Sequence, residues 1–164
     1  MWAKTSTGRA IALVDHTGVR RSLGDFRGKL VVLYFGYASC PDICPTDLFY
    51  IAEMVRSFCT TGDQIQPVFI TIDPERDTPE QLKRYIPYFH PRFIGLTGSA
   101  AEILGVADRY KVYFAKVPVS GSPNYVMDRS ADTLLLDREG KVLRAFPSGT
   151  KADRLTEGVR AQLC

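Results

Sequence analysis

The sequence predicts an α/β domain in which a central mixed sheet is flanked by helices. Residues 29–36 form a continuous β-branched and aromatic run, as in a strand buried on both faces of a sheet, and residues 65–72 are predicted to be a second buried strand. Each run is followed by a segment with helical spacing of its apolar residues. The chain then closes with a predicted hairpin, at residues 133–136 and 142–146, and an amphipathic helix at residues 151–163.

Local patterns predict the remaining elements. Thr78 is a good N-cap, because Pro79 follows it in the first turn and Gln81 lies three residues on, so a helix is expected from there to about Phe89. The other expected elements are strands at residues 11–14, 19–20, 93–96 and 112–117 and helices at residues 48–58 and 100–109. A β-α-β unit followed by a hairpin and a closing helix is the plan of a thioredoxin-like fold. We expect one such domain over residues 1–164.

The composition excludes several classes of protein. With 45% apolar and 24% charged side chains among 164 residues, it is that of an ordinary globular protein. A net charge of +3 is too small and too scattered to indicate a nucleic-acid partner. The longest apolar run, residues 30–35, is far shorter than the ~20 residues of a membrane-spanning helix. No secretory leader is recognisable, so a membrane is expected to be reached only through an anchor that this chain does not contain.

The strongest local signal is a pair of cysteines, Cys40 and Cys44, at the turn between the first buried strand and its helix. Residues four apart on a helix have β-carbons about 5–6 Å apart, and a tight loop would bring the two thiols closer. Either geometry permits a disulfide or the binding of a soft metal. A helix N-terminus favours the thiolate, which is both the nucleophile and the metal ligand. The pair is therefore expected to be reactive, with a purely structural disulfide as the alternative.

Four other residues are candidates for supporting roles. Cys59 and Cys164 end two helices that a thioredoxin-like fold places on one face of the sheet, which permits a structural disulfide between them. The alternative is a buried Cys59 and a frayed terminal Cys164. Asp73 and Asp77 follow the second buried strand, near the cysteine loop in this fold, where Asp73 could accept a proton or orient the thiol site. The alternative for both carboxylates is turn and cap chemistry beside the flanking prolines.

Three segments resemble the motifs of the Sco/SenC family: YFGYASCPDICPT at residues 34–46, TIDPERDTP at 71–79 and FHPRFIGLTG at 89–98. Members of this family are thioredoxin-fold proteins tethered to bacterial or mitochondrial inner membranes. The resemblance covers nearly the whole chain. It implies a role in assembling the copper centre of cytochrome c oxidase, by delivering copper, by reducing cysteines of the target, or by both.

The resemblance also implies a location and a partner. The location would be the periplasmic side of a bacterial inner membrane or the mitochondrial intermembrane space. The partner would be the oxidase subunit that carries the copper centre, or another periplasmic thiol or copper protein. The chain would then be the soluble part of a membrane-anchored protein.

The family's metal site uses two cysteines and a histidine, and the resemblance assigns these to Cys40, Cys44 and the position of Arg129. Arginine keeps its proton and has no lone pair for a metal. Two thiolates still suit Cu(I), whereas Cu(II) is expected to bind weakly or not at all without the imidazole. At the family's histidine position, Arg129 would stabilise a thiolate by its charge. The alternative is a side chain that turns to solvent or pairs with Asp128 or Asp132.

Two functions therefore stay open. The first is a copper chaperone of the Sco type. The second is a dithiol–disulfide oxidoreductase without a stable copper site, in which Cys40 attacks and Cys44 resolves the mixed disulfide. The two histidines, His16 and His90, are expected in a turn and a loop rather than at the metal.

Overall fold

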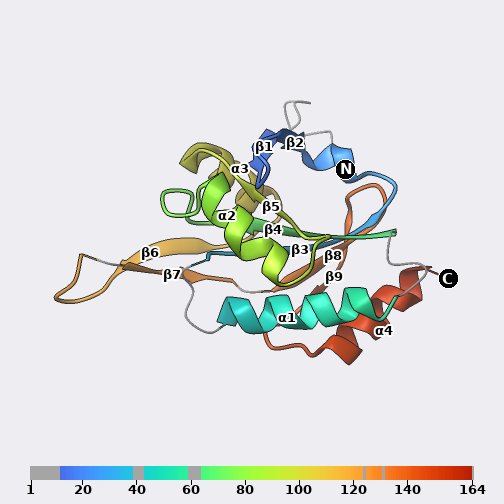
Figure 1. Cartoon of the computed structure of the whole chain (residues 1–164). Coiled ribbons are helices and arrows are strands. Elements are labelled where there is room, and N and C mark those ends of the chain that lie inside the picture. The colour runs from blue at the N-terminus through green and yellow to red at the C-terminus, as the bar shows by residue number, and fades with distance from the viewer. Residues whose placement is uncertain (1–11, 39–42, 59–63, 124, 131, 164) are drawn as a thin grey trace.

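A computed structural model describes residues 12–38, 43–58, 64–123, 125–130 and 132–163, and it has the predicted α/β architecture (Figure 1). The strands of the central sheet are β1 (Ala12–Asp15), β2 (Arg20–Ser22), β3 (Leu30–Gly36), β4 (Ile65–Thr71), β5 (Ile94–Thr97), β8 (Thr133–Leu136) and β9 (Val142–Phe146). They lie in the order β2-β1-β5-β4-β3-β8-β9. The pairs β3–β4 and β4–β5 are parallel, whereas β1 and β8 pair antiparallel with β5 and β3. The sheet is therefore mixed, as predicted.

Helices cover both faces of this sheet (Figure 1). On one face lie α1 (Ile43–Arg56) and α4 (Ala152–Leu163), and on the other lie α2 (Pro79–Tyr85) and α3 (Ala100–Arg109). The hydroxyls of Ser57 and Thr156 lie 3.3 Å apart, so the end of α1 contacts α4. Within the described ranges, no helix is both long and apolar enough to span a membrane.

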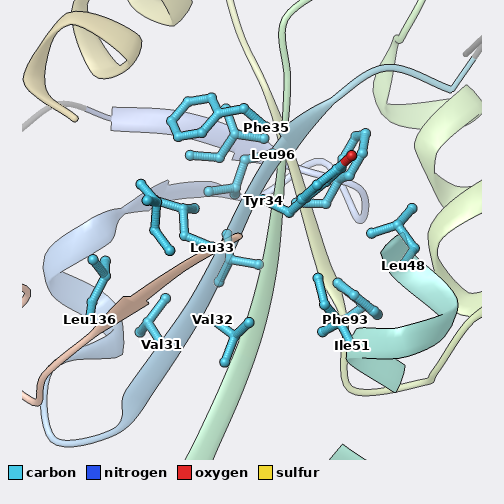
Figure 2. Packing of buried hydrophobic residues seen from close by; sticks show 14 of the residues in the cluster. Val31, Val32, Leu33, Tyr34, Phe35, Leu48, Ile51, Phe93, Leu96 and Leu136 are labelled. Atoms are coloured by element: carbon cyan, nitrogen blue, oxygen red, sulfur yellow. The ribbon is translucent and has the colours of Figure 1, made fainter. Parts of the chain in front are cut away.

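The core is built around β3, every residue of which is buried. Alternate side chains of this strand point to opposite faces of the sheet. Figure 2 shows Tyr34 on the side of Leu48 and Ile51 from α1, and Phe35 on the opposite side, near Leu96. Helix α1 is therefore packed onto the sheet immediately after the loop that contains the cysteine motif.

Helix α2 is shorter than the sequence predicts. It has the expected cap, in which the Thr78 hydroxyl accepts a hydrogen bond from the backbone N–H of Gln81. It ends at Tyr85 rather than near Phe89, and a 3-10 turn (Ile86–Tyr88) follows. Pro87 explains the difference, because proline has no N–H to donate and its ring crowds the carbonyl of the preceding turn.

A second, two-stranded sheet projects from one end of the domain (Figure 1). It pairs β6 (Phe114–Pro118) with β7 (Tyr125–Arg129) in antiparallel register. Strand β6 begins two residues later than predicted, because Lys111 has a φ of 57° and the N–H of Val112 donates to the carbonyl of Ala107. Strand β7 was not predicted. The hairpin matters because β7 runs from Tyr125 to Arg129, the residue for which the sequence resemblance implies a role at the metal site.

Candidate metal and redox site

The cysteine motif lies where β3 passes into α1. Gly36 ends the buried strand, and Cys44 is the second residue of the helix. A backbone position in the first helical turn lies in the positive field of the helix N-terminus. Cys40 and the side chain of Cys44 lie outside the described residues, so the distance between the two sulfurs stays a prediction.

Asp77 contacts the backbone at the start of this loop. Its Oδ2 accepts hydrogen bonds from the backbone N–H of Ala38, at 2.9 Å, and from the Thr71 hydroxyl, at 2.7 Å. Its other carboxylate oxygen is buried and accepts no hydrogen bond within the described part of the chain. Burial raises the pKa of Asp77, against the opposing effect of the two hydrogen bonds. The structure thus joins Asp77 to a residue two positions before Cys40.

Asp73 lies in the same loop region but faces the hairpin. Its side chain is buried and forms an ion pair with Arg76, and its Oδ1 accepts a hydrogen bond from the Tyr125 hydroxyl at 2.7 Å. Burial and this hydrogen bond raise the pKa of Tyr125 to about 12. Asp77 therefore contacts the start of the cysteine loop, whereas the observed side-chain partners of Asp73 are Arg76 and Tyr125 of the hairpin.

Strand β7 lies against the residues that precede the cysteines. The backbone N–H of Met127 donates to the hydroxyl of Tyr37 at 3.2 Å. Tyr37 is buried and precedes Cys40 by three positions. The strand ends at Arg129, which pairs across the hairpin with Phe114. The backbone of Arg129 therefore belongs to a strand that contacts the segment before the cysteines. The Arg129 side chain lies outside what the structure describes.

Asp47 anchors the start of α1, and sequence reasoning did not identify it. Its carboxylate accepts hydrogen bonds from the Tyr34 hydroxyl at 2.8 Å, the Ser148 hydroxyl at 2.7 Å and the Gly149 N–H at 2.8 Å. It thereby joins the helix that contains Cys44 to β3 and to the loop before α4. An acidic residue one turn after Cys44 was the available signal, but its partners are distant in the sequence.

Neither histidine is placed as a metal ligand by its surroundings. Nδ1 of His16 accepts the N–H of Gly95 at 3.2 Å, and Nδ1 of His90 accepts the N–H of Arg92 at 3.0 Å. Burial and nearby arginine charges lower the pKa of His90. Over the ranges that the structure describes, no three His, Cys, Asp or Glu side chains form a group that could hold a metal.

The second cysteine pair also lies outside the described residues. The segments that lead to Cys59 and Cys164 are neighbours, because the guanidinium of Arg160 lies 5.4 Å from the ring centre of Phe58. Helices α1 and α4 lie on one face of the sheet, as the sequence predicted. The disulfide between Cys59 and Cys164 stays a prediction.

The fold and the motif define a thioredoxin-fold protein with a C-x-x-x-C segment at its strand-to-helix turn. The sequence matches the SCO1/SenC family over residues 2–163, so the chain belongs to this family. It is 46% identical to the SCO2-like protein of Rickettsia felis over 140 residues, which cover 85% of this chain and 68% of that protein. It is 40% identical to the mitochondrial SCO2 homologue of Bos taurus over 154 residues, which cover 93% of this chain and 58% of the bovine protein.

Comparison with a solved structure shows that the chain has the fold of a Sco protein. The crystal structure of Arabidopsis thaliana ScoI with copper bound is 37% identical in sequence and superposes with a TM-score of 0.88. The match covers 94% of this chain and 96% of the plant chain. The predicted fold class and family are therefore confirmed.

Proposed function

We propose that this protein takes part in assembling the copper centre of cytochrome c oxidase, with Cys40 and Cys44 as the residues that bind copper or exchange electrons. The observation that carries the proposal is the position of Cys44 in the first turn of α1, the helix that follows the buried strand β3. Tyr37, in the segment between the two elements, contacts strand β7. Membership of the SCO1/SenC family supports it, as does the copper in the related plant ScoI.

The donor set favours Cu(I) as the copper cargo. Two thiolates are soft ligands, and Cu(I) accepts a low coordination number. Arg129 offers no lone pair at the family's histidine position. The two histidines of the chain bind backbone amides elsewhere, so the residues present do not support an imidazole ligand for Cu(II). We therefore expect tight Cu(I) binding and weak or absent Cu(II) binding.

Reduction of a target disulfide is a second candidate function, and the positive charge of Arg129 favours it. The thiolate of Cys40 attacks one sulfur of the target disulfide, which forms a mixed disulfide and releases the other target sulfur as a thiolate. The thiolate of Cys44 then attacks Cys40 in the mixed disulfide and releases the second target thiolate. Two electrons pass to the target, whose thiolates take up protons, and the Cys40–Cys44 disulfide remains.

The place and the partner follow from the same proposal. We expect the protein on the periplasmic side of a bacterial inner membrane or in the mitochondrial intermembrane space, held there by an anchor. Its partner would be the oxidase subunit that carries the copper centre, or another thiol or copper protein of that compartment. Cys59 and Cys164 would form a structural disulfide there, because such compartments are oxidising.

A competition titration tests the metal function. The reduced protein is titrated with Cu(I) against a coloured Cu(I) chelator, next to the variants Cys40→Ser and Cys44→Ser. Since loss of a residue that only supports a ligand costs about 10–100-fold in affinity, loss of a thiolate ligand should cost more than ~100-fold. The matched controls are Cys59→Ser and Cys164→Ser, which should bind Cu(I) like the parent. Equal binding by Cys40→Ser and the parent would contradict the proposal.

A further inference from the structure

Three side chains join the hairpin to the body of the domain, and we call them the hairpin lock: Asp73, Arg76 and Tyr125. The Tyr125 hydroxyl donates to Asp73, and Arg76 forms an ion pair with the same carboxylate. Nη1 of Arg76 donates to the Tyr125 carbonyl at 3.2 Å, and its guanidinium lies 3.9 Å from the centre of the Tyr125 ring. Tyr125 is therefore held by its hydroxyl, its ring and its backbone.

Apolar packing and polar contacts both attach this hairpin to the domain. A two-stranded ribbon is only marginally stable without further contacts. A cavity of about 150 Å³ lies between the hairpin and α3, and Phe114, Met127 and Ile103 are among its lining residues. Phe114 and Met127 also pack against the core, and the polar contacts of the lock add directional attachment of β7.

The lock also reaches the cysteine segment. The Arg76 guanidinium lies 5.8 Å from the centre of the Tyr37 ring, and Tyr37 accepts the hydrogen bond from Met127. The two-residue repeat of a strand places positions 125, 127 and 129 on one face of β7. Tyr125 and Met127 contact the body of the domain from this face. The backbone of position 129 therefore ends the strand that Tyr125 and Met127 attach to the body.

We propose that Tyr125, held by Asp73 and Arg76, is a positioning residue that fixes position 129 relative to the cysteine pair. The inference rests on the proposed function, because it assumes that Cys40 and Cys44 are the reactive thiols. Tyr125 contacts neither copper nor the reacting sulfurs; it acts through the course of β7. With the lock intact, Arg129 stabilises the thiolates and hence the reduced pair. With the lock released, this effect weakens.

The test is a double-mutant cycle on the thiol–disulfide equilibrium with glutathione. Tyr125→Phe removes the hydroxyl and keeps the ring, and it should shift the equilibrium of the Cys40–Cys44 pair toward the disulfide by about 3–10-fold. In an Arg129→Gln background the same substitution should have no effect. Tyr113→Phe is the matched control, because Tyr113 is an exposed tyrosine at the base of the same hairpin. It should leave the equilibrium unchanged.

Two results would overturn the inference. One is an unchanged equilibrium in Tyr125→Phe, and the other is an equal shift in both backgrounds, which would indicate a general structural effect. Hydrogen exchange at the Met127 amide gives an independent measurement: it should accelerate in Tyr125→Phe, and unchanged exchange would also count against the lock. Because the Cu(I) titration of the cysteine variants is a separate measurement, failure of the proposed function is distinguishable from failure of the lock.

Discussion

The backbone N–H of Ala38 donates a hydrogen bond to Oδ2 of Asp77 at 2.9 Å, across 39 positions of sequence. The same oxygen accepts the hydroxyl of Thr71, the last residue of β4. One carboxylate oxygen therefore joins the exits of β3 and β4, which are parallel neighbours in the sheet. The Asp77 carboxylate therefore holds the backbone at the start of the cysteine loop through the N–H of Ala38.

Removal of the Asp77 carboxylate should loosen the start of the cysteine loop. Asp77→Ala leaves the Ala38 N–H and the Thr71 hydroxyl without this acceptor, so we expect a loss of about 1–3 kcal/mol in the free energy of unfolding. Asp77→Asn keeps one acceptor oxygen and should keep most of the stability. Hydrogen exchange at the Ala38 amide is the direct measurement, and equal protection in Asp77→Ala and the parent would show that the contact is not needed.

The raised pKa of Asp77 also predicts a pH effect. Its pKa is higher in the folded than in the unfolded protein, so the unfolded state ionises first as the pH rises. The parent should lose stability as the pH rises from the unfolded pKa through the folded one, and Asp77→Asn should lose less. Chemical denaturation across that range measures the difference, and parallel curves would contradict the assignment.

The lowered pKa of Asp15 predicts the opposite dependence of stability on pH. Burial alone would raise its pKa, but hydrogen bonds from Arg21, Thr17 and the backbone of Val19 lower it to about 2. The carboxylate therefore contributes about 2 kcal/mol of stability above pH ~4, and this contribution is lost as the pH falls toward 2. Asp15→Asn should lack this component of the acid transition. Glu157→Gln, at an exposed position of α4, should behave like the parent, and a similar change in both variants would contradict the prediction.

Removal of the Asp47 carboxylate should lower the free energy of unfolding more than removal of most other carboxylates. Asp47→Ala takes away an acceptor used by the Tyr34 and Ser148 hydroxyls and by the Gly149 N–H. We expect a loss of about 2–3 kcal/mol in the free energy of unfolding, because the group is buried and its three hydrogen-bond donors would lose their acceptor. Glu53→Ala, an exposed position on the same helix, should change stability little. Equal losses in the two variants would show that the Asp47 network is not stabilising.

Gly158 should resist substitution by alanine despite lying inside α4. Alanine favours a helix by about 1 kcal/mol over glycine. A β-carbon at Gly158 would lie 2.5 Å from Cζ of Phe146, whose ring is buried. Crowding of this kind costs about 1–3 kcal/mol, so we expect a net loss of about 1 kcal/mol. Thermal unfolding of Gly158→Ala measures it, and an increase in stability would mean that Phe146 moves aside.

The sequence was informative where structure depends on neighbours along the chain. The hairpin of β8 and β9 has the predicted bounds, because Gly140 supplies the turn with a φ of 88° between two apolar segments. Strands β3 and β4 were recognisable because a strand buried on both faces is rich in β-branched and aromatic residues. Cys44 lies in the first turn of the helix that follows β3.

The sequence was less informative where partners are remote. Strand β7 lacks a continuous apolar pattern, because alternate side chains are exposed while the others contact distant residues. Asp73 was a candidate, but its role depends on Tyr125, which is 52 positions away and reaches it only through the register of β6 and β7. No local pattern specifies such a pair.

We propose that Arg129 stands at the position of an imidazole ligand. Titration of the reduced protein with Cu(II), monitored by the thiolate-to-copper absorption bands, tests it most directly when Arg129→His is titrated beside the parent. We expect weak or absent binding by the parent and a gain of at least about 100-fold in Cu(II) affinity in Arg129→His, since an imidazole ligand is restored. Tight Cu(II) binding by the parent, or no gain in Arg129→His, would contradict the account.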